Sequence, residues 1–325
     1  MWETVGRTAP DTRGERDGDD PPQPFVPLPR DLPNPREAAR TVFDGMADLY
    51  DAARPGYPAD VVAELVELCH VGPSSTVLEI GAGTGQLTRS LAPSGGRMLC
   101  LEPGRSLAGR ARKNLASFAN VDVVETTFEQ FVGPPGPFDL AVSATAFHWI
   151  DPSLSFAKVA KLLGRAGHLV LITNVHGAGG SQERIAGEVQ RLHRRMAPEV
   201  GTWTFPTLAE LEGRALAGGD IAAVWHRVER KFEEPPPVDG LFAPPQVFVH
   251  PWLATYSGRS YLDMLRSQSS YALMEPPRRE RLFDELGQLI AARLGDEVTK
   301  QYITVLAVAR KGDGTNVRDP AHQPG

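Results

Sequence analysis

Three glycines at alternate positions follow a short apolar run in this chain. The run is Thr76–Ile80, and the glycines are Gly81, Gly83 and Gly85. Glycine adopts backbone conformations and permits close approaches that a side chain would block. A strand, a glycine turn and a helix start together direct free N–H groups at a ligand. The stretch therefore predicts a cradle for a nucleotide-like molecule.

Two carboxylates accompany this turn. Glu79 lies in the strand, and Glu102 ends the next apolar run, Arg97–Leu101. An acid at the tip of the second strand can accept both hydroxyls of a ribose. The dinucleotide fingerprint would need a third glycine at position 86, where Gln86 stands. The spacing favours another nucleoside ligand, with a nicotinamide oxidoreductase and a glycine-rich surface turn as the alternatives.

The pattern G-x-G-x-G preceded by Glu79 resembles motif I of the class I S-adenosylmethionine-dependent methyltransferases. The string FDLAVSATAFHWID, residues 138–151, resembles motif IV of a small-molecule branch of that class, in which a His-Trp pair lies beside the transferring methyl group. YLDMLRSQSSY and YITVLAVARK resemble the end of the same branch. The resemblance covers about residues 40–310.

The resemblance implies S-adenosyl-L-methionine as the cofactor, with the ribose at Glu102. In related enzymes an Asp often hydrogen-bonds the amino group of the adenine. This chain has Thr127 and Phe128 near that place instead. Phe128 could cover the adenine face, or it could equally be a core residue. The cofactor-binding residues implied are Glu79, Gly81, Ala82, Gly83, Gly85, Gln86, Glu102, Pro103, Thr127, Phe128, Ser143 and Ala144.

His148 is the candidate catalytic residue, because an imidazole exchanges a proton near neutral pH. The alternative is a structural histidine near the cofactor. The resemblance and the aromatic content of the later segments predict acceptor and lid contacts at Tyr50, Arg54, Tyr57, Phe147, Trp149, His176, Trp203 and Trp252. We expect no metal, because Thr173-Asn174-Val175 stands where cation-dependent relatives carry acids.

The composition excludes several classes of protein. The chain has 325 residues, 41% of them hydrophobic, a net charge of −6 and two cysteines. This charge gives no footprint for nucleic acid or an anionic membrane. No apolar run approaches transmembrane length, and the start of the chain lacks a signal-peptide pattern. We expect a cytoplasmic, soluble protein whose partner is a small-molecule acceptor.

Apolar periodicity predicts an α/β fold with a doubly wound sheet. The resemblance implies that this sheet is seven-stranded and mostly parallel, with an antiparallel last strand and helical lid insertions. Residues 1–36 are predicted to be a disordered tail, 37–177 the cofactor-binding core and 178–275 the lid, which includes a sheet strand at 221–232. Residues 276–310 supply a helix and a strand that complete the core, and 311–325 form a second tail.

The function expected from these features is metal-free, in-line methyl transfer to a small molecule. Oxygen of a hydroxyl or carboxylate is the first choice of acceptor atom, and nitrogen or carbon the second. The same fold could also bind the cofactor without methylating, as a regulatory protein or another catalyst.

Overall fold

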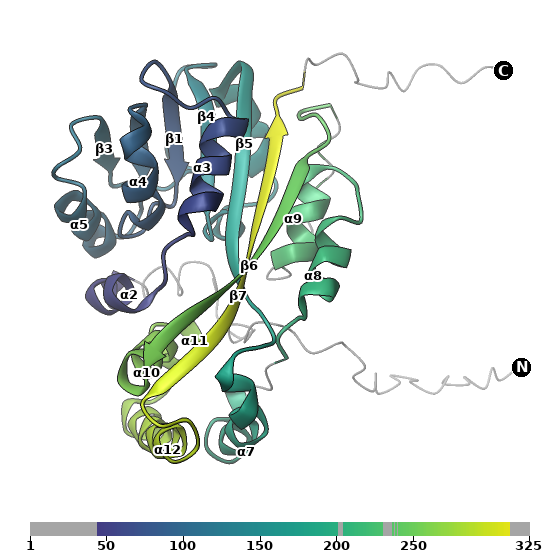
Figure 1. The fold of residues 1–325 in the computed structure, drawn as a ribbon. Coiled ribbons are helices and arrows are strands. Elements are labelled where there is room, and N and C mark those ends of the chain that lie inside the picture. Colours follow the sequence, from purple (N-terminus) through teal and green to yellow (C-terminus); the bar gives the residue numbers. More distant parts are fainter. Residues whose placement is uncertain (1–43, 201–203, 230–235, 237, 239, 313–325) are drawn as a thin grey trace, which may run out of the picture.

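The computed structural model describes residues 44–312, except 201–203, 230–235, 237 and 239. One seven-stranded sheet organises the chain, in the order β3-β2-β1-β4-β5-β7-β6 (Figure 1). β7 runs antiparallel between β5 and β6, and the pairs among β1 to β5 are parallel, so the predicted fold class is confirmed. The strands are β1 (Thr76–Ile80), β2 (Arg97–Leu101), β3 (Val121–Val124), β4 (Phe138–Ala144), β5 (Leu163–His176), β6 (Gln246–Ser257) and β7 (Glu297–Arg310).

Helices cover both faces of this sheet. α3 (Ala59–Leu68) and α4 (Gln86–Leu91) pack on one face through Val61, Leu65 and Leu87. α6 (Ser155–Leu162) and α9 (Ile221–Glu229) pack on the other, where Phe156 and Trp225 are buried. The remaining helices of the sheet region are α2 (Ala47–Ala53), α5 (Arg105–Asn114) and α8 (Leu208–Ala215), with short 3₁₀ turns at Ala92–Ser94 and Phe147–Trp149.

β6 and β7 extend beyond the other strands as a twisted pair that ends among the lid helices (Figure 1). These helices share a separate apolar core that contains Tyr261, Tyr271 and Phe283. The lid comprises 3₁₀ turns at Ser181–Ile185 and Pro198–Val200, and α7 (Ala186–Met196), α10 (Gly258–Arg266), α11 (Ser269–Ala272) and α12 (Pro276–Leu294). The carboxyl ends of β1, β4 and β5 point toward this lid.

The strand predicted at 221–232 is wrong, because residues Ile221–Glu229 form helix α9. Its buried residues Ile221, Val224 and Val228 fit helical spacing better than alternation. Asp220 supports the helix start, since its Oδ1 accepts a hydrogen bond from the backbone N–H of Ala223 at 2.8 Å. The sixth strand of the sheet is β6, which pairs with β7 along its whole length.

Two further boundaries need correction. The sequence predicts that the helix in residues 276–310 completes the core. This helix, α12, packs in the lid against α7 and α10, so within 276–310 only β7 joins the sheet. Conversely, α8 and α9 fall in the predicted lid segment and pack on the sheet instead. Residues 1–36 and 313–325 of the predicted tails, and the residue Trp203, lie outside the described residues. Lys311, which the sequence assigns to the second tail, forms an isolated β-bridge with Phe242. Within the described ranges, every helix is too short or too polar to cross a membrane.

Candidate active site

The glycine turn after β1 has the backbone that the sequence predicts. Gly81, Gly83 and Gly85 all have positive φ angles, of +75°, +59° and +84°, which L side chains rarely adopt. A Cβ atom on Gly81 would lie 2.5 Å from the Cβ of Ala146, so glycine is needed there for close packing against the segment after β4. At Gly83 the nearest atom to such a Cβ is Cε1 of Tyr50, at 3.9 Å.

Glu102 holds this turn through its side chain. Its Oε2 accepts a hydrogen bond from the backbone N–H of Gly83 at 2.8 Å, and its Oε1 accepts one from Gly104 at 2.8 Å. The carboxylate is thus fixed between the turn after β1 and the turn after β2. A carboxylate at the tip of the second strand is the kind of group that accepts hydrogen bonds from the hydroxyls of a ribose.

Glu79 is fully buried beneath the turn, and one of its oxygens lacks a partner. Thr88 donates a hydrogen bond to Oε2 at 2.7 Å, whereas Oε1 has no hydrogen-bond partner among the described residues. Burial raises the pKa of Glu79 to about 7, although the bond from Thr88 opposes the shift. A buried acceptor without a donor is costly. The residue therefore fits a ligand that brings a cationic amine, as S-adenosylmethionine does.

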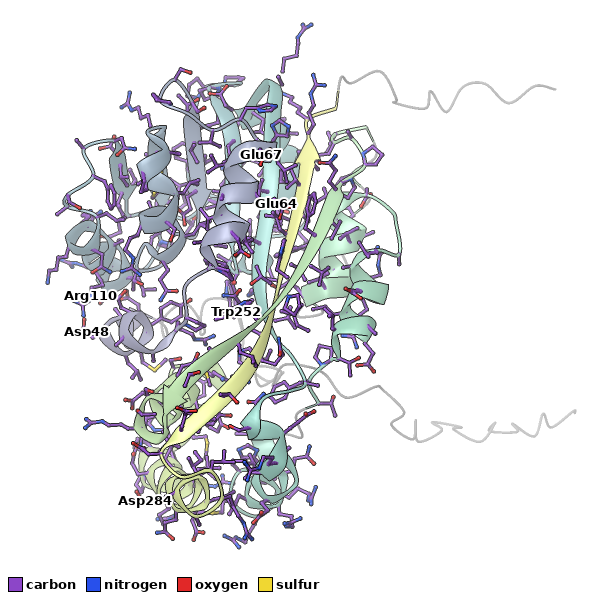
Figure 2. The ribbon with its side chains drawn as sticks, viewed as in Figure 1. Asp48, Glu64, Glu67, Arg110, Trp252 and Asp284 are labelled. Carbon is purple, nitrogen blue, oxygen red and sulfur yellow. The ribbon has the colours of Figure 1, made fainter. Side chains whose placement is uncertain are left out.

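Helix α2 covers the glycine turn. Tyr50 lies over Gly83, and the guanidinium carbon of Arg54 lies 5.4 Å from the Tyr50 ring centroid. Arg54 also donates from Nε to Oγ of Ser267 in the lid, at 2.9 Å. Gln86 donates from Nε2 to the backbone oxygen of Arg54 at 3.1 Å. Figure 2 shows Asp48 of α2 and Arg110 of α5 beside each other, joined by a 2.8 Å ion pair.

A loop after α2 lies across the carboxyl ends of β4 and β5. The hydroxyl of Tyr57 is 2.9 Å from Oγ1 of Thr145, and Asn174 donates to the backbone oxygen of Gly56 at 3.0 Å. Thr145 has a φ of +54°, which is uncommon for a β-branched residue and typical of functional sites. Ser143 ties the neighbouring strands together, because its Oγ donates to the Ile80 carbonyl at 2.7 Å.

His148 lies on the 3₁₀ turn that follows β4, next to a residue that sequence reasoning missed. Its Nδ1 is 3.4 Å from Oε2 of Glu229, and the two side chains are only 5% and 2% exposed. The ring of Trp149 packs at 4.8 Å from the His148 ring, centroid to centroid. Glu229 ends helix α9, so the mistaken strand assignment hid this partner.

Several predicted contacts belong to the apolar core. Phe128 is buried in the cluster beneath β4 and α6, with the Lys158 ammonium 5.0 Å from its ring centroid. Phe147 packs against Phe156 at 4.9 Å between ring centroids. Thr127 accepts a hydrogen bond from the backbone N–H of Gln130. Pro103 and Ala144 are half-buried at the ends of their strands, and Ala82 is buried in the turn.

An aromatic wall follows β5 and β7 toward the lid. His176 packs edge-on against Tyr302 at 5.2 Å between centroids, and Trp252 stacks on the other side at 5.0 Å. Trp252 donates from Nε1 to Oγ1 of Thr304 at 2.8 Å. Figure 2 places Trp252 midway along β6, between the sheet and the lid helices. The sequence indicated His176 and Trp252, but it did not single out Tyr302.

The structure therefore brings together two groups of predicted residues. The glycine turn, Glu79, Glu102, Tyr50 and Gln86 form the first, and Tyr57, Thr145 and the aromatic wall form the second. In the described ranges, no three His, Cys, Asp or Glu side chains are grouped as ligands for a metal ion.

Comparison with known proteins identifies a family model and a similar solved structure. The family model described as a methyltransferase domain matches residues 77–167, which run from β1 into the first part of β5. The YcgJ protein of Bacillus subtilis is a similar solved structure, with 16% identity and a TM-score of 0.45, over 78% of this chain and 98% of that one.

Sequence relatives carry the same family name. An uncharacterised methyltransferase of Geobacillus sp. strain WCH70 is 30% identical over 177 residues, which span 51% of this chain and 82% of that protein. An uncharacterised methyltransferase of Mycobacterium tuberculosis is 27% identical over 147 residues, or 45% of this chain and 58% of that protein. The chain belongs to the class I S-adenosylmethionine-dependent methyltransferases, and its cofactor is S-adenosylmethionine.

Proposed function

We propose that this methyltransferase acts on a small-molecule acceptor and methylates an oxygen atom, without a metal. The observation that carries the proposal is the buried pair of His148 and Glu229. His148 lies in the turn that follows β4, and Glu229 ends helix α9. A histidine held by a carboxylate is suited to take the proton of a hydroxyl. The aromatic wall formed by His176, Trp252 and Tyr302 supports an acceptor with an apolar body.

The cofactor would lie on the glycine turn. Gly83 has no side chain between its backbone and Tyr50, and Glu102 offers a carboxylate for the ribose. Glu79 offers an amine a carboxylate oxygen that has no hydrogen-bond partner among the described residues. When bound, S-adenosylmethionine supplies a methyl group that a sulfonium has already activated. The chain's own task is then to align the acceptor and to remove one proton, and alignment alone lowers barriers by up to about 7–11 kcal/mol.

His148 and Glu229 would have separate roles in the proton transfer. Glu229 orients the imidazole through Nδ1, and Nε2 is the ring atom that would accept the hydroxyl proton. Tyr57 and Thr145 would border the reacting atoms, since they join the loop after α2 to the tip of β4. Arg54 and Tyr50 would hold α2 closed over the cofactor.

The test is incubation of the protein with S-adenosylmethionine and a mixed library of small hydroxy and carboxylic acids. We expect S-adenosylhomocysteine to form and the product to carry its new methyl on oxygen. Mass spectrometry, together with alkaline hydrolysis of esters, identifies the methylated atom. A methyl group found on nitrogen or carbon would contradict the proposal, as would tight cofactor binding with no turnover on any acceptor.

A further inference from the structure

Lys300 is a buried cation that the proposed chemistry does not use. It lies on β7 with only 1% of its surface exposed, and burial lowers its pKa to about 7. Its Nζ donates one hydrogen bond, to Oε1 of Gln182 at 2.9 Å. Among the residues that the structure describes, no Asp or Glu forms an ion pair with it.

The surroundings satisfy this ammonium only in part. Its Nζ lies 4.3 Å from the ring centroid of Phe205 and 5.5 Å from that of Tyr302. Aromatic faces attract a cation, but they are weak substitutes for water. An ammonium has three N–H donors, and Gln182 accepts from one of them. Among the described residues, the other two donors have no oxygen acceptor, and that is costly for a buried charge.

Gln182 is held with its oxygen toward Lys300. Tyr261 donates a hydrogen bond to the same Oε1 at 3.1 Å, while Nε2 of Gln182 lies 3.4 Å from the Gly177 carbonyl. The amide orientation is therefore set by the chain on both sides. This network holds the Lys300 ammonium in place, with the rings of Phe205 and Tyr302 beside its remaining N–H donors.

Lys300 adjoins the wall already described for the acceptor. Tyr302 is two residues further along the same strand, so the two side chains share a face of β7. His176, at the end of β5, packs against Tyr302 and lies 6.0 Å from Phe205, centroid to centroid. A molecule seated on this wall would end at the ammonium.

We propose that Lys300 anchors the acceptor by a carboxylate distant from the methylated atom. This inference rests on the proposed function, since it concerns the same acceptor. A single buried ammonium neutralises a single charge, which suits a monoanionic carboxylate better than a phosphate. In the sheet, β7 stands two places from β4. Lys300 lies six residues along β7 from Leu306, which is level with Ala144 at the end of β4. At about 3.3 Å per residue and about 4.8 Å per strand, Lys300 lies on the order of 20 Å from that strand end. The acceptor is then an elongated hydroxy acid or a dicarboxylic acid, with one carboxylate at Lys300 and the methylated oxygen elsewhere.

A glycine-rich segment packs against β7 beside Lys300. Residues Gly177, Gly179 and Gly180 lie beside β7, and a Cβ on Gly177 would lie 3.0 Å from Ile303. Glycine gives this segment more backbone freedom than its neighbours have. Its displacement, together with Phe205, would expose the ammonium to a ligand that enters along the aromatic wall.

The test measures binding of carboxylates to the full chain saturated with S-adenosylhomocysteine. The probes are octanoate and para-hydroxycinnamate, their neutral amides, and inorganic phosphate, each titrated by calorimetry. We expect at least one carboxylate to bind more tightly than its amide and than phosphate. Lys300→Met should weaken that carboxylate about ten- to a hundredfold and leave its amide unchanged. The exposed Lys161→Met is the matched control and should change nothing.

A second variant covers the case in which Lys300→Met fails to fold. Gln182→Glu keeps the side-chain shape and gives the ammonium an internal counter-charge, so it should also weaken carboxylate binding. Wild-type protein that prefers neither carboxylate to its amide would overturn the inference, as would variants that retain the preference. Because the readout is binding, a failure of the oxygen-methylation proposal would appear separately, as the wrong methylated atom or no turnover.

Discussion

Nδ1 of His148 lies 3.4 Å from Oε2 of Glu229, and this pair joins the turn after β4 to the end of α9. Two side chains of this kind are rarely buried together without a role, because their burial costs free energy. The carboxylate lies at ion-pair distance from the imidazole. The pair is the proposed device for removing a proton from an acceptor.

The first prediction concerns this pair. His148→Ala should lower turnover at least about tenfold, since a positioned base contributes about 10²–10⁴-fold, while cofactor affinity changes little. Glu229→Gln should lower turnover in the same direction. Because the two residues act as a unit, the double variant should lose little more than His148→Ala alone. Fully additive losses, or unchanged turnover in His148→Ala, would remove the pair from the mechanism.

The second prediction concerns the ribose site. Glu102→Ala should weaken binding of S-adenosylhomocysteine by about 1 to 2 kcal/mol, roughly tenfold in dissociation constant, the scale of a charge-assisted hydrogen bond. Glu67→Ala, on the exposed side of α3 (Figure 2), is the control and should bind normally. An unaltered dissociation constant in Glu102→Ala, measured by calorimetry, would mean that Glu102 only braces the glycine turn.

The third prediction concerns the close approach at Gly81. A methyl group added there would meet Ala146 at 2.5 Å, in a backbone conformation with a φ of +75°. Gly81→Ala should therefore destabilise the fold by about 1–3 kcal/mol and weaken cofactor binding. Gly109→Ala in α5, where a Cβ meets nothing within 4 Å, should instead stabilise the helix slightly. Urea unfolding compares the two, and equal stability would contradict the predicted clash.

The fourth prediction concerns Glu79 and pH. Its pKa is about 7 in the folded protein against an ordinary value of 4.5. Between these values the folded chain keeps a proton that the unfolded chain has released, so the free energy of unfolding falls as pH rises. The contribution is present below pH 4.5 and lost through pH 7, with a total of about 3 kcal/mol. Glu79→Gln should flatten this slope, and an unchanged pH profile in urea unfolding would contradict the shift.

β1, β2 and β4 were predictable from the sequence because they are short and largely apolar. β5, β6 and β7 are longer, at 14, 12 and 14 residues. β1, β2 and β4 begin where expected, and the antiparallel place of β7 was correct. The failure at α9 has a physical cause. Ile221, Val224 and Val228 favour strands as β-branched residues, but their helical spacing and burial against the sheet decide the structure.

The candidate site was predictable where backbone conformation demands a residue type. Gly81, Gly83 and Gly85 need positive φ angles, and that requirement is visible in the sequence. Partners brought together by tertiary packing were not visible. Glu229 comes close to His148 because α9 packs on the sheet. Lys300 belongs to no sequence motif, and only its burial distinguishes it from an exposed lysine.

The most direct test of the central claim is a crystal structure of the protein with S-adenosylhomocysteine. The account predicts the nucleoside on the turn from Gly81 to Gly85, its ribose hydroxyls within hydrogen-bond distance of Glu102 and its amine near Glu79. A nucleoside bound elsewhere, with the glycine turn filled by side chains of the protein itself, would contradict it.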